Sequence, residues 1–143
     1  MIPPQRMRAT EYRRPRKINA VSITLLAFLG IAVYLVLALW PVLTLRLRVK
    51  SELEDVLPNL WRINLRSEDT ARTEIARMKR ELTEKLPKLG VRDKKAEVVF
   101  ERGKKRVAIE ARFATSVTFP VLNKTKTFQL APRAETDAAR VEW

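Results

Sequence analysis

The sequence predicts a membrane-anchored α+β protein with one transmembrane helix, followed by a short helix, an amphipathic helix and a three-stranded antiparallel meander. Three observations predict this fold class. Residues 18–45 contain no charged residue. Residues 71–86 repeat apolar positions at helical spacing, and residues 96–130 change to the two-residue period of strands. A chain of 143 residues holds at most one ordinary domain in addition to such an anchor.

The uncharged run of residues 18–45 is the predicted transmembrane helix. It is longer than the roughly 20 apolar residues that cross a bilayer, whereas a core helix would need only about 10–14. Residues 21–43 contain fourteen Leu, Ile, Val and Phe. At the usual insertion energies these side chains favour the membrane by roughly 4–8 kcal/mol.

Other interpretations of this run fit less well. A cleaved export signal has an apolar core of roughly 7–15 residues and a small-x-small cleavage site, and neither feature is present. Arg13-Arg14 before the run is typical of a twin-arginine signal, but Pro15 interrupts that pattern. The core helix of a soluble protein would need a thick shell of protein around it, which residues 51–143 are too few to form.

Basic residues flank the run on both sides. The chain carries a net charge of +13, yet residues 51–143 contain 20 basic and 15 acidic residues, so most of the excess lies beside the run. This distribution favours contact with anionic lipid headgroups over nucleic acid. The predicted membrane-interface residues are Arg13, Arg14, Arg16, Lys17, Trp40, Arg46 and Arg48.

The same charges predict the orientation. Six Lys and Arg precede the run within residues 1–17, and four follow it within residues 46–62. The positive-inside rule therefore predicts a cytoplasmic basic tail, residues 1–17, and a C-terminal domain on the periplasmic side of a bacterial inner membrane. A docking peptide for a cytoplasmic partner is the alternative interpretation of the tail.

Residues 46–66 are predicted to form a juxtamembrane linker with a short helix. Residues 43–50 alternate like a strand, whereas Ser51-Glu-Leu-Glu54 matches a capping box. We expect a short helix that Pro58 stops. The transmembrane helix either ends near Pro41 or continues with a kink.

Residues 67–131 are predicted to form a small α+β domain that begins with an amphipathic helix. Ser67 is the predicted N-cap, and Pro87 and Gly90 are predicted to end the helix. The apolar stripe of this helix consists of Ala71, Ile75, Met78, Leu82 and Leu86. We expect the stripe to cover the protein's own sheet; binding a partner helix is the alternative.

Strands are predicted at residues 96–101, 106–122 and 125–131, with a turn at 102–105. The helix stripe and one face of this sheet each supply half of a two-layer core. Residues 132–143 are polar and weakly patterned, which predicts a flexible or partner-ordered tail.

The absence of Cys and His limits the chemistry of the chain. It excludes thiolate and imidazole metal sites, Ser–His–Asp and Cys–His nucleophile systems and disulfides. Glu97, Glu101 and Glu110 lie on adjacent predicted strands, where an acid/base pair is conceivable, but pairing of Glu110 with Arg112 explains them better. We expect no enzyme activity, catalytic residue, metal or cofactor.

The densest basic cluster beyond the membrane flank is a possible polyanion contact. It consists of Arg102, Lys104, Lys105 and Arg106. A plain hairpin tip is the alternative interpretation, with Gly103 at positive φ and solvated charges beside it. No aromatic stacking partner is interleaved with the charges, which favours the plain tip.

The order of elements resembles pilin-like bitopic proteins of bacteria, and among them an uncharacterised family with a single N-terminal span. The matching stretches are "EIARMKRELTEKLPKLGV" (74–91) and "RVAIEARFATSVTFPVLNKTKTFQL" (106–130). True prepilins carry a Gly-Phe-Thr-x-x-Glu processing site, whereas "KINAVSIT" has no Gly at this boundary and no Glu. The resemblance implies a membrane-tethered accessory domain and transfers no functional residue.

We therefore expect a structural, accessory or assembly subunit of a larger envelope complex. Its expected partners are the lipid bilayer and other membrane or envelope proteins, in a homo- or hetero-oligomer. The alternative is a membrane-tethered basic module that binds anionic lipid, cell-wall polymer or nucleic acid, of which nucleic acid is the least expected.

Overall fold

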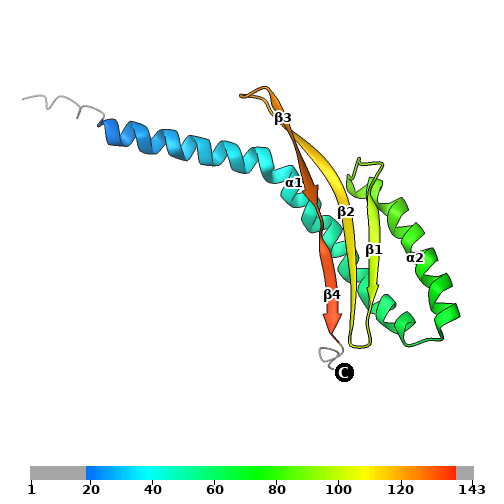
Figure 1. Cartoon of the computed structure of the whole chain (residues 1–143). Helices are drawn as coiled ribbons and strands as arrows, with labels where there is room; N and C mark the ends of the chain where they lie inside the picture. The colour runs from blue at the N-terminus through cyan, green and yellow to red at the C-terminus, as the bar shows by residue number, and fades with distance from the viewer. Residues whose placement is uncertain (1–18, 138–143) are drawn as a thin grey trace, which may run out of the picture. The chain divides into compact units, whose positions relative to one another are not determined.

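The computed structural model describes residues 19–137 (Figure 1). It forms two units, the first ending at Tyr34 and the second beginning at Leu35, and each is described by itself. The described elements are helices α1 (Ala20–Asn64) and α2 (Glu68–Leu89), and strands β1 (Glu97–Arg102), β2 (Arg106–Phe119), β3 (Lys124–Leu130) and β4 (Arg133–Asp137).

The part of α1 that belongs to the first unit is an exposed apolar helix. None of the most apolar 18-residue window of α1 is buried within the protein, and Phe28 is 70% exposed. By length and composition this helix can cross a membrane. The core helix of a soluble protein would be mostly buried, which this window is not.

Helix α1 does not end where the sequence suggested. It runs through Pro41 and Pro58 to Asn64, so the predicted linker at residues 46–66 with a separate short helix is wrong. An internal proline removes one helical hydrogen bond and costs about 3 kcal/mol. Pro58 lies on the exposed side of α1, while its neighbours Leu57 and Leu60 are buried. Packing of this buried stripe offsets the cost of the proline.

Helix α2 begins and ends at capping residues. Ser67 occupies the N-cap position, but its hydroxyl lies 3.0 Å from the Thr70 hydroxyl and caps no backbone N–H. Gly90 follows the helix with φ of 109°, and its N–H and that of Val91 donate to the carbonyls of Pro87 and Leu86. This is a Schellman motif. Pro87 therefore lies within the last turn, and Gly90 alone ends the helix.

Strand β2 is the centre of an antiparallel sheet. Its first half pairs with β1 on one edge, from Arg102↔Val107 to Glu97↔Arg112. Its second half pairs with β3, from Phe113↔Leu130 to Phe119↔Lys124. Strands β3 and β4 follow one another along the second edge, because β4 continues the same register at Glu110↔Arg133.

The fourth strand corrects the prediction of a flexible tail at residues 132–143. Residues 133–137 pair with the first half of β2, and Pro132 and Ala134 are buried. The Pro132 carbonyl accepts the Ala111 N–H at 3.0 Å, which keeps the chain on the sheet between the two strands. Residues 138–143, including Trp143, lie outside the described residues, as does the basic tail of residues 1–17.

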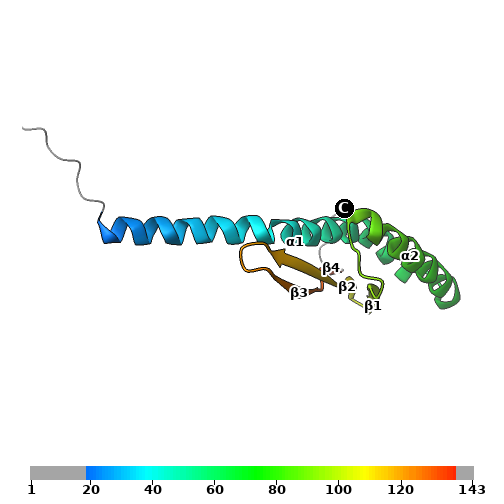
Figure 2. The same cartoon turned by 90° about the horizontal axis from the view of Figure 1, so that it is seen from above.

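The core lies between one face of the sheet and both helices, and α1 and the sheet are seen side by side in Figure 2. The apolar stripe of α2 packs against this core, so the sequence interpretation of the stripe is confirmed. A second stripe from α1 shares the same core. The largest contributors are Val49, Leu53, Leu57, Leu60, Leu82, Leu86, Val98, Val107, Ile109 and Phe113.

Truncation of Leu60 tests whether α1 is part of the domain core. Leu60 is fully buried, so Leu60→Ala should lower the free energy of unfolding by about 2–5 kcal/mol. Leu65→Ala is the matched control, because Leu65 is 72% exposed and its truncation should change stability by less than about 0.5 kcal/mol. Urea unfolding of the full chain in detergent micelles, followed by circular dichroism, measures both. Equal stability of the two variants would contradict this core.

Candidate functional site: a groove beside the open edge of β2

A hollow of about 610 Å³ lies within the second unit. Its walls are α1, the loop from α2 to β1, and the second half of β2. The residues that form it are Pro41, Val42, Thr44, Leu45, Arg48, Leu89, Gly90, Arg92, Asp93, Ala114, Thr115, Ser116, Val117 and Thr127. We call this hollow the β2 groove.

One wall of the β2 groove is an open strand edge. Pairing with β1 stops at Arg112, although β2 continues to Phe119. The Ala114 N–H points to this edge, since it donates to the Asp93 carboxylate at 2.8 Å. Alternation along a strand turns the N–H and C=O groups of Ser116 and Thr118 to the same edge. No strand within residues 19–137 pairs with them there.

Asp93 joins the loop before β1 to strand β2 at one end of the β2 groove. One carboxylate oxygen accepts the Ala114 N–H, and the other accepts the Lys95 N–H at 2.9 Å. The Ala114 hydrogen bond, followed by the one from Lys95, holds the pKa of Asp93 below its ordinary value of 3.8. Asp93 therefore stays ionised at neutral pH, and both of its oxygens are already occupied by the protein's own backbone.

Two arginines give the β2 groove a positive charge. Arg48 comes from α1 and Arg92 from the loop before β1, and both side chains line the hollow. Both residues are exposed, and neither forms an ion pair with any described carboxylate. The groove thus combines unpaired backbone donors and acceptors with two available guanidinium groups, a combination that suits an extended acidic segment.

The predicted membrane-interface residues are placed only in part. Arg13, Arg14, Arg16 and Lys17 lie outside the described residues. Trp40 is 59% exposed and directly precedes Pro41 at the end of the groove. Arg46 is exposed on the same helix, and Arg48 belongs to the groove wall. Their contact with lipid stays a prediction.

The predicted polyanion residues lie at the other end of β2, in the hairpin that joins it to β1. Lys104, Lys105 and Arg106 are exposed. Arg102 instead ties the hairpin to the end of α1, because its Nε donates to the Asn64 side-chain oxygen at 3.0 Å and the Asn64 amide donates to the Gly103 carbonyl at 3.2 Å. The structure therefore assigns Arg102 a structural contact.

Gly103 does not adopt the positive φ that the sequence suggested. Its N–H donates to the Arg106 carbonyl at 2.8 Å, and a Cβ at this position would lie 3.1 Å from that oxygen. A larger residue here would need the Arg106 carbonyl to shift by a few tenths of an ångström, so the close approach of the backbone across the turn favours glycine. The positive φ occurs in the other hairpin, at Asn123, with a value of 49°.

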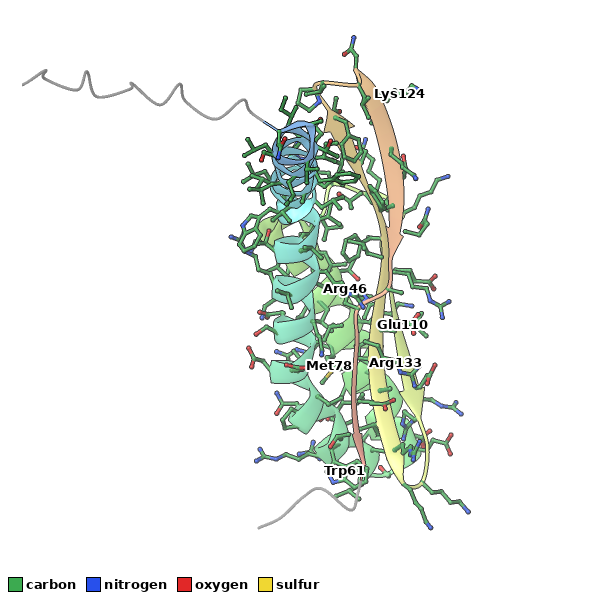
Figure 3. The ribbon with its side chains drawn as sticks, turned by 90° about the vertical axis from the view of Figure 1, so that its left-hand side faces the viewer. Arg46, Trp61, Met78, Glu110, Lys124 and Arg133 are labelled. Atoms are coloured by element: carbon green, nitrogen blue, oxygen red, sulfur yellow. The ribbon has the colours of Figure 1, made fainter. Side chains whose placement is uncertain are left out.

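Two of the three glutamates singled out on the sheet, Glu101 and Glu110, are engaged in ion pairs. Arg133 donates to both oxygens of Glu101 at 3.2 and 2.8 Å and lies 3.6 Å from Glu110 (Figure 3). The hydrogen bond from Arg112 is the largest cause that lowers the pKa of Glu110. A carboxyl group held ionised is a poor general acid. Within residues 19–137 no three carboxylates gather in a metal-binding group.

No protein-family model matches the chain, and neither a curated protein nor a solved structure matches it. The function is therefore argued from the groove and the anchor.

The charge of Asp93 should contribute to stability in a pH-dependent way. Asp93→Asn keeps one acceptor oxygen but loses the second, so it should lower the unfolding temperature at neutral pH. Because the pKa of Asp93 is lowered by folding, its contribution is complete above pH 3.8 and is lost as the pH falls through the lower native pKa. The difference in unfolding temperature between Asp93→Asn and the unsubstituted chain should therefore disappear in strong acid.

Asp55→Asn is the control for this measurement, because Asp55 is exposed on α1 and accepts no backbone hydrogen bond in the described part of the chain. Thermal unfolding of each protein in micelles across the acid range gives the comparison. A neutral-pH unfolding temperature of Asp93→Asn equal to that of the unsubstituted chain would show that the two hydrogen bonds do not hold the loop.

Proposed function

We propose that this chain is a single-pass membrane protein and a structural, accessory or assembly subunit of a larger envelope complex. Its second unit accepts an extended acidic segment of another membrane-associated protein along the open edge of β2. The observation that carries this proposal is the unpaired edge of β2 from Ser116 to Thr118, of which Ser116 lines a groove together with the last residues of the apolar run.

The end of the apolar run and the start of the core support a location at the membrane surface. Leu45 is the last residue of the run, and Val49 is the first fully buried residue of α1. The four helical steps between them span about 6 Å. A domain tethered this closely meets partners that are confined to the same membrane, which raises their effective concentration without a large interface.

A strand edge is a specific docking element. Natural sheets protect their edges with charges, prolines or covering loops, because unpaired backbone groups accept foreign strands. Here Asp93 covers only the Ala114 N–H, and the next edge residues, Ser116 and Thr118, are small and exposed. Backbone pairing supplies affinity in such complexes, and neighbouring side-chain contacts supply specificity.

The charge of the groove selects among extended segments. Arg48 and Arg92 line the groove and form no ion pair with the described carboxylates. Aspartate or glutamate in the incoming segment would pair with them through charge-assisted hydrogen bonds. We therefore commit to an acidic strand from a different protein. The bacterial inner membrane, the cytoplasmic N-terminus and the pilin-like character remain predictions.

The alternative function, binding of anionic lipid, cell-wall polymer or nucleic acid at the basic hairpin, has less support. Arg102 keeps its charge, but its Nε is already engaged by Asn64, so its side chain is less free to turn toward a polyanion. The hairpin lies beside Asn64, and α1 rises on the order of 30 Å between Pro41 and that residue. Lipid headgroups at the end of the apolar run are out of reach at such a distance.

Substitutions at Ser116 test the open edge. Ser116→Pro removes an N–H that no described strand uses, so the domain should still fold, but an added strand would lose a hydrogen bond and meet the proline ring. Ser116→Ala keeps the N–H and is the matched control. After detergent extraction, a stoichiometric membrane partner should co-purify with the unsubstituted chain and with Ser116→Ala, and at least tenfold less with Ser116→Pro. Equal recovery with both variants, or a clean monomer throughout, would refute edge docking.

Arginine substitutions test the anchor. Each arginine near the centre of a span opposes insertion by about 2.5–3.5 kcal/mol, so Leu26→Arg with Leu29→Arg approaches the whole insertion energy of the run. The unsubstituted chain should remain in the membrane pellet after alkaline carbonate extraction, and the double variant should move largely to the supernatant. Leu65→Arg, outside the run, should stay in the pellet. An unsubstituted chain that is itself extracted would exclude the anchor.

A further inference from the structure

We propose that the tip of the β2–β3 hairpin, residues 119–124, is a second membrane contact of this protein. Val121 and Leu122 enter the boundary between headgroups and acyl chains, and Lys124 and Lys126 contact anionic headgroups. The proposal rests on the anchoring of α1 in the same bilayer, which is part of the proposed function. It is independent of the partner at the β2 groove.

The tip exposes apolar side chains that the fold does not require. Val121 is 76% exposed and Leu122 is 62% exposed. Outside α1, the described part of the chain exposes only one other large apolar side chain to this degree, that of Leu65. Two adjacent exposed apolar residues at a hairpin end are typical of a surface that another apolar phase covers.

The tip points toward the anchor end of the second unit. Strand β2 starts beside the end of α1, where Arg102 and Gly103 contact Asn64. Its other end lies beside Pro41 and Val42, which line the β2 groove together with Val117. The strand therefore runs antiparallel to α1. Figure 3 shows Lys124 and Trp61 at opposite ends of the second unit.

The length of the hairpin brings its tip level with the apolar run. Val117 lies beside Pro41 and Val42, and the strand and turn beyond it extend roughly 10 Å further at about 3.3 Å per residue. The tip therefore lies beyond the level of Pro41, at the end of the second unit where residues 35–40 of the uncharged run are found. A bilayer that holds residues 35–40 of the run, as proposed above, would lie within reach of the tip.

The hairpin is built to present this tip in a fixed form. Asn123 takes the positive φ of the turn, which asparagine tolerates better than most residues. The hydroxyls of Thr118 and Thr125 lie 3.0 Å apart and join the two strands just behind the turn. A preorganised tip loses little conformational freedom when lipid covers it.

Charge identifies the occupant as lipid. Residues 118–130 contain two lysines and no acidic residue. The Lys126 ammonium lies 5.9 Å from the centre of the Phe128 ring, and basic and aromatic side chains of this kind are common at membrane interfaces. Anionic headgroups favour basic residues close to the surface, and a second copy of this basic tip would repel it.

Fluorescent probes on single cysteines test the contact, because the natural chain contains no Cys. Full-length Leu122→Cys, Lys105→Cys and Phe28→Cys are labelled with nitrobenzoxadiazole and reconstituted in vesicles of phosphatidylcholine and phosphatidylglycerol. At position 122, emission should shift to the blue, lipid with a shallow doxyl group should quench most of it, and iodide should quench little. At position 105, in the other hairpin, iodide should quench most of the emission. At position 28, within the apolar run, doxyl lipid should quench the emission if the run is inserted in the bilayer.

Each result decides between the proposals. Quenching of position 122 by iodide, as at position 105, while doxyl lipid quenches position 28, would overturn the tip contact and leave the anchor intact. Failure of doxyl lipid to quench position 28 would overturn the anchor and the tip together. Shielding of position 122 from iodide without quenching by doxyl lipid would mean that protein covers the tip, and would also overturn the proposal.

Two further variants exclude an effect of the probe and test the charges. Val121→Asp in the Leu122→Cys chain should return the probe to water, and persistent doxyl quenching would show that the probe inserts by itself. For the probe at position 122, doxyl quenching should be weaker in pure phosphatidylcholine vesicles than in the mixed vesicles. In the chain that also carries Lys124→Gln and Lys126→Gln, quenching should be the same in both kinds of vesicle. If pure phosphatidylcholine supports equal quenching of the unsubstituted tip, the headgroup contact of the lysines is wrong.

Discussion

Packing of the second half of α1 against the inner face of the sheet sets the position of every other feature of the second unit. Val49, Leu53, Leu57 and Leu60 recur at intervals of four, four and three residues and are all buried. The same helix carries the apolar run immediately before this stripe. One element therefore supplies both the apolar run and a large part of the core, and its fully buried residues begin where the apolar run ends.

The length of β2 explains both the open edge at the β2 groove and the protruding tip of the β2–β3 hairpin. This strand has 14 residues, whereas β1 has 6 and β3 has 7, so no single partner can cover an edge of β2. Strands β3 and β4 share one edge in sequence, but β1 leaves the other edge unpaired beyond Arg112. The unpaired stretch becomes the wall of the groove, and the same excess of length extends the hairpin toward the anchor end.

The sequence predicted the elements whose signal is local and periodic. The apolar run, the stripe of α2 and the first three strands each repeat a pattern over many residues. The continuity of α1 could not be predicted, because Ser51-Glu-Leu-Glu54 and Pro58 indicate a break while the opposing contacts come from distant strands. Strand β4 could not be predicted because its sequence shows little alternation, with Ala134 as its buried apolar residue. Its pairing with β2 continues the register of β3.

The groove was also beyond prediction, since its positive charge and its open edge come from three segments far apart in the chain. Arg48 was singled out only as a flank of the membrane span, which does not reveal that it also lines the groove, and Arg92 and Asp93 were not singled out at all. The role of Asp93 as the acceptor for Ala114 depends on a contact across 21 positions of sequence.

The proposed tether would restrict which strand can occupy the open edge. Two copies inserted in the same direction would be related by a rotation about the membrane normal, and β2 runs antiparallel to a helix whose residues 35–45 belong to the apolar run. Where β2 follows the membrane normal, the two β2 edges would run parallel, and a two-fold axis would place each N–H opposite the same N–H of the other copy. Hydrogen bonds are poorly placed in that arrangement. With the anchor proposed above, a closed pair of identical edges is therefore disfavoured, which agrees with the proposal that the edge accepts a chain of different sequence.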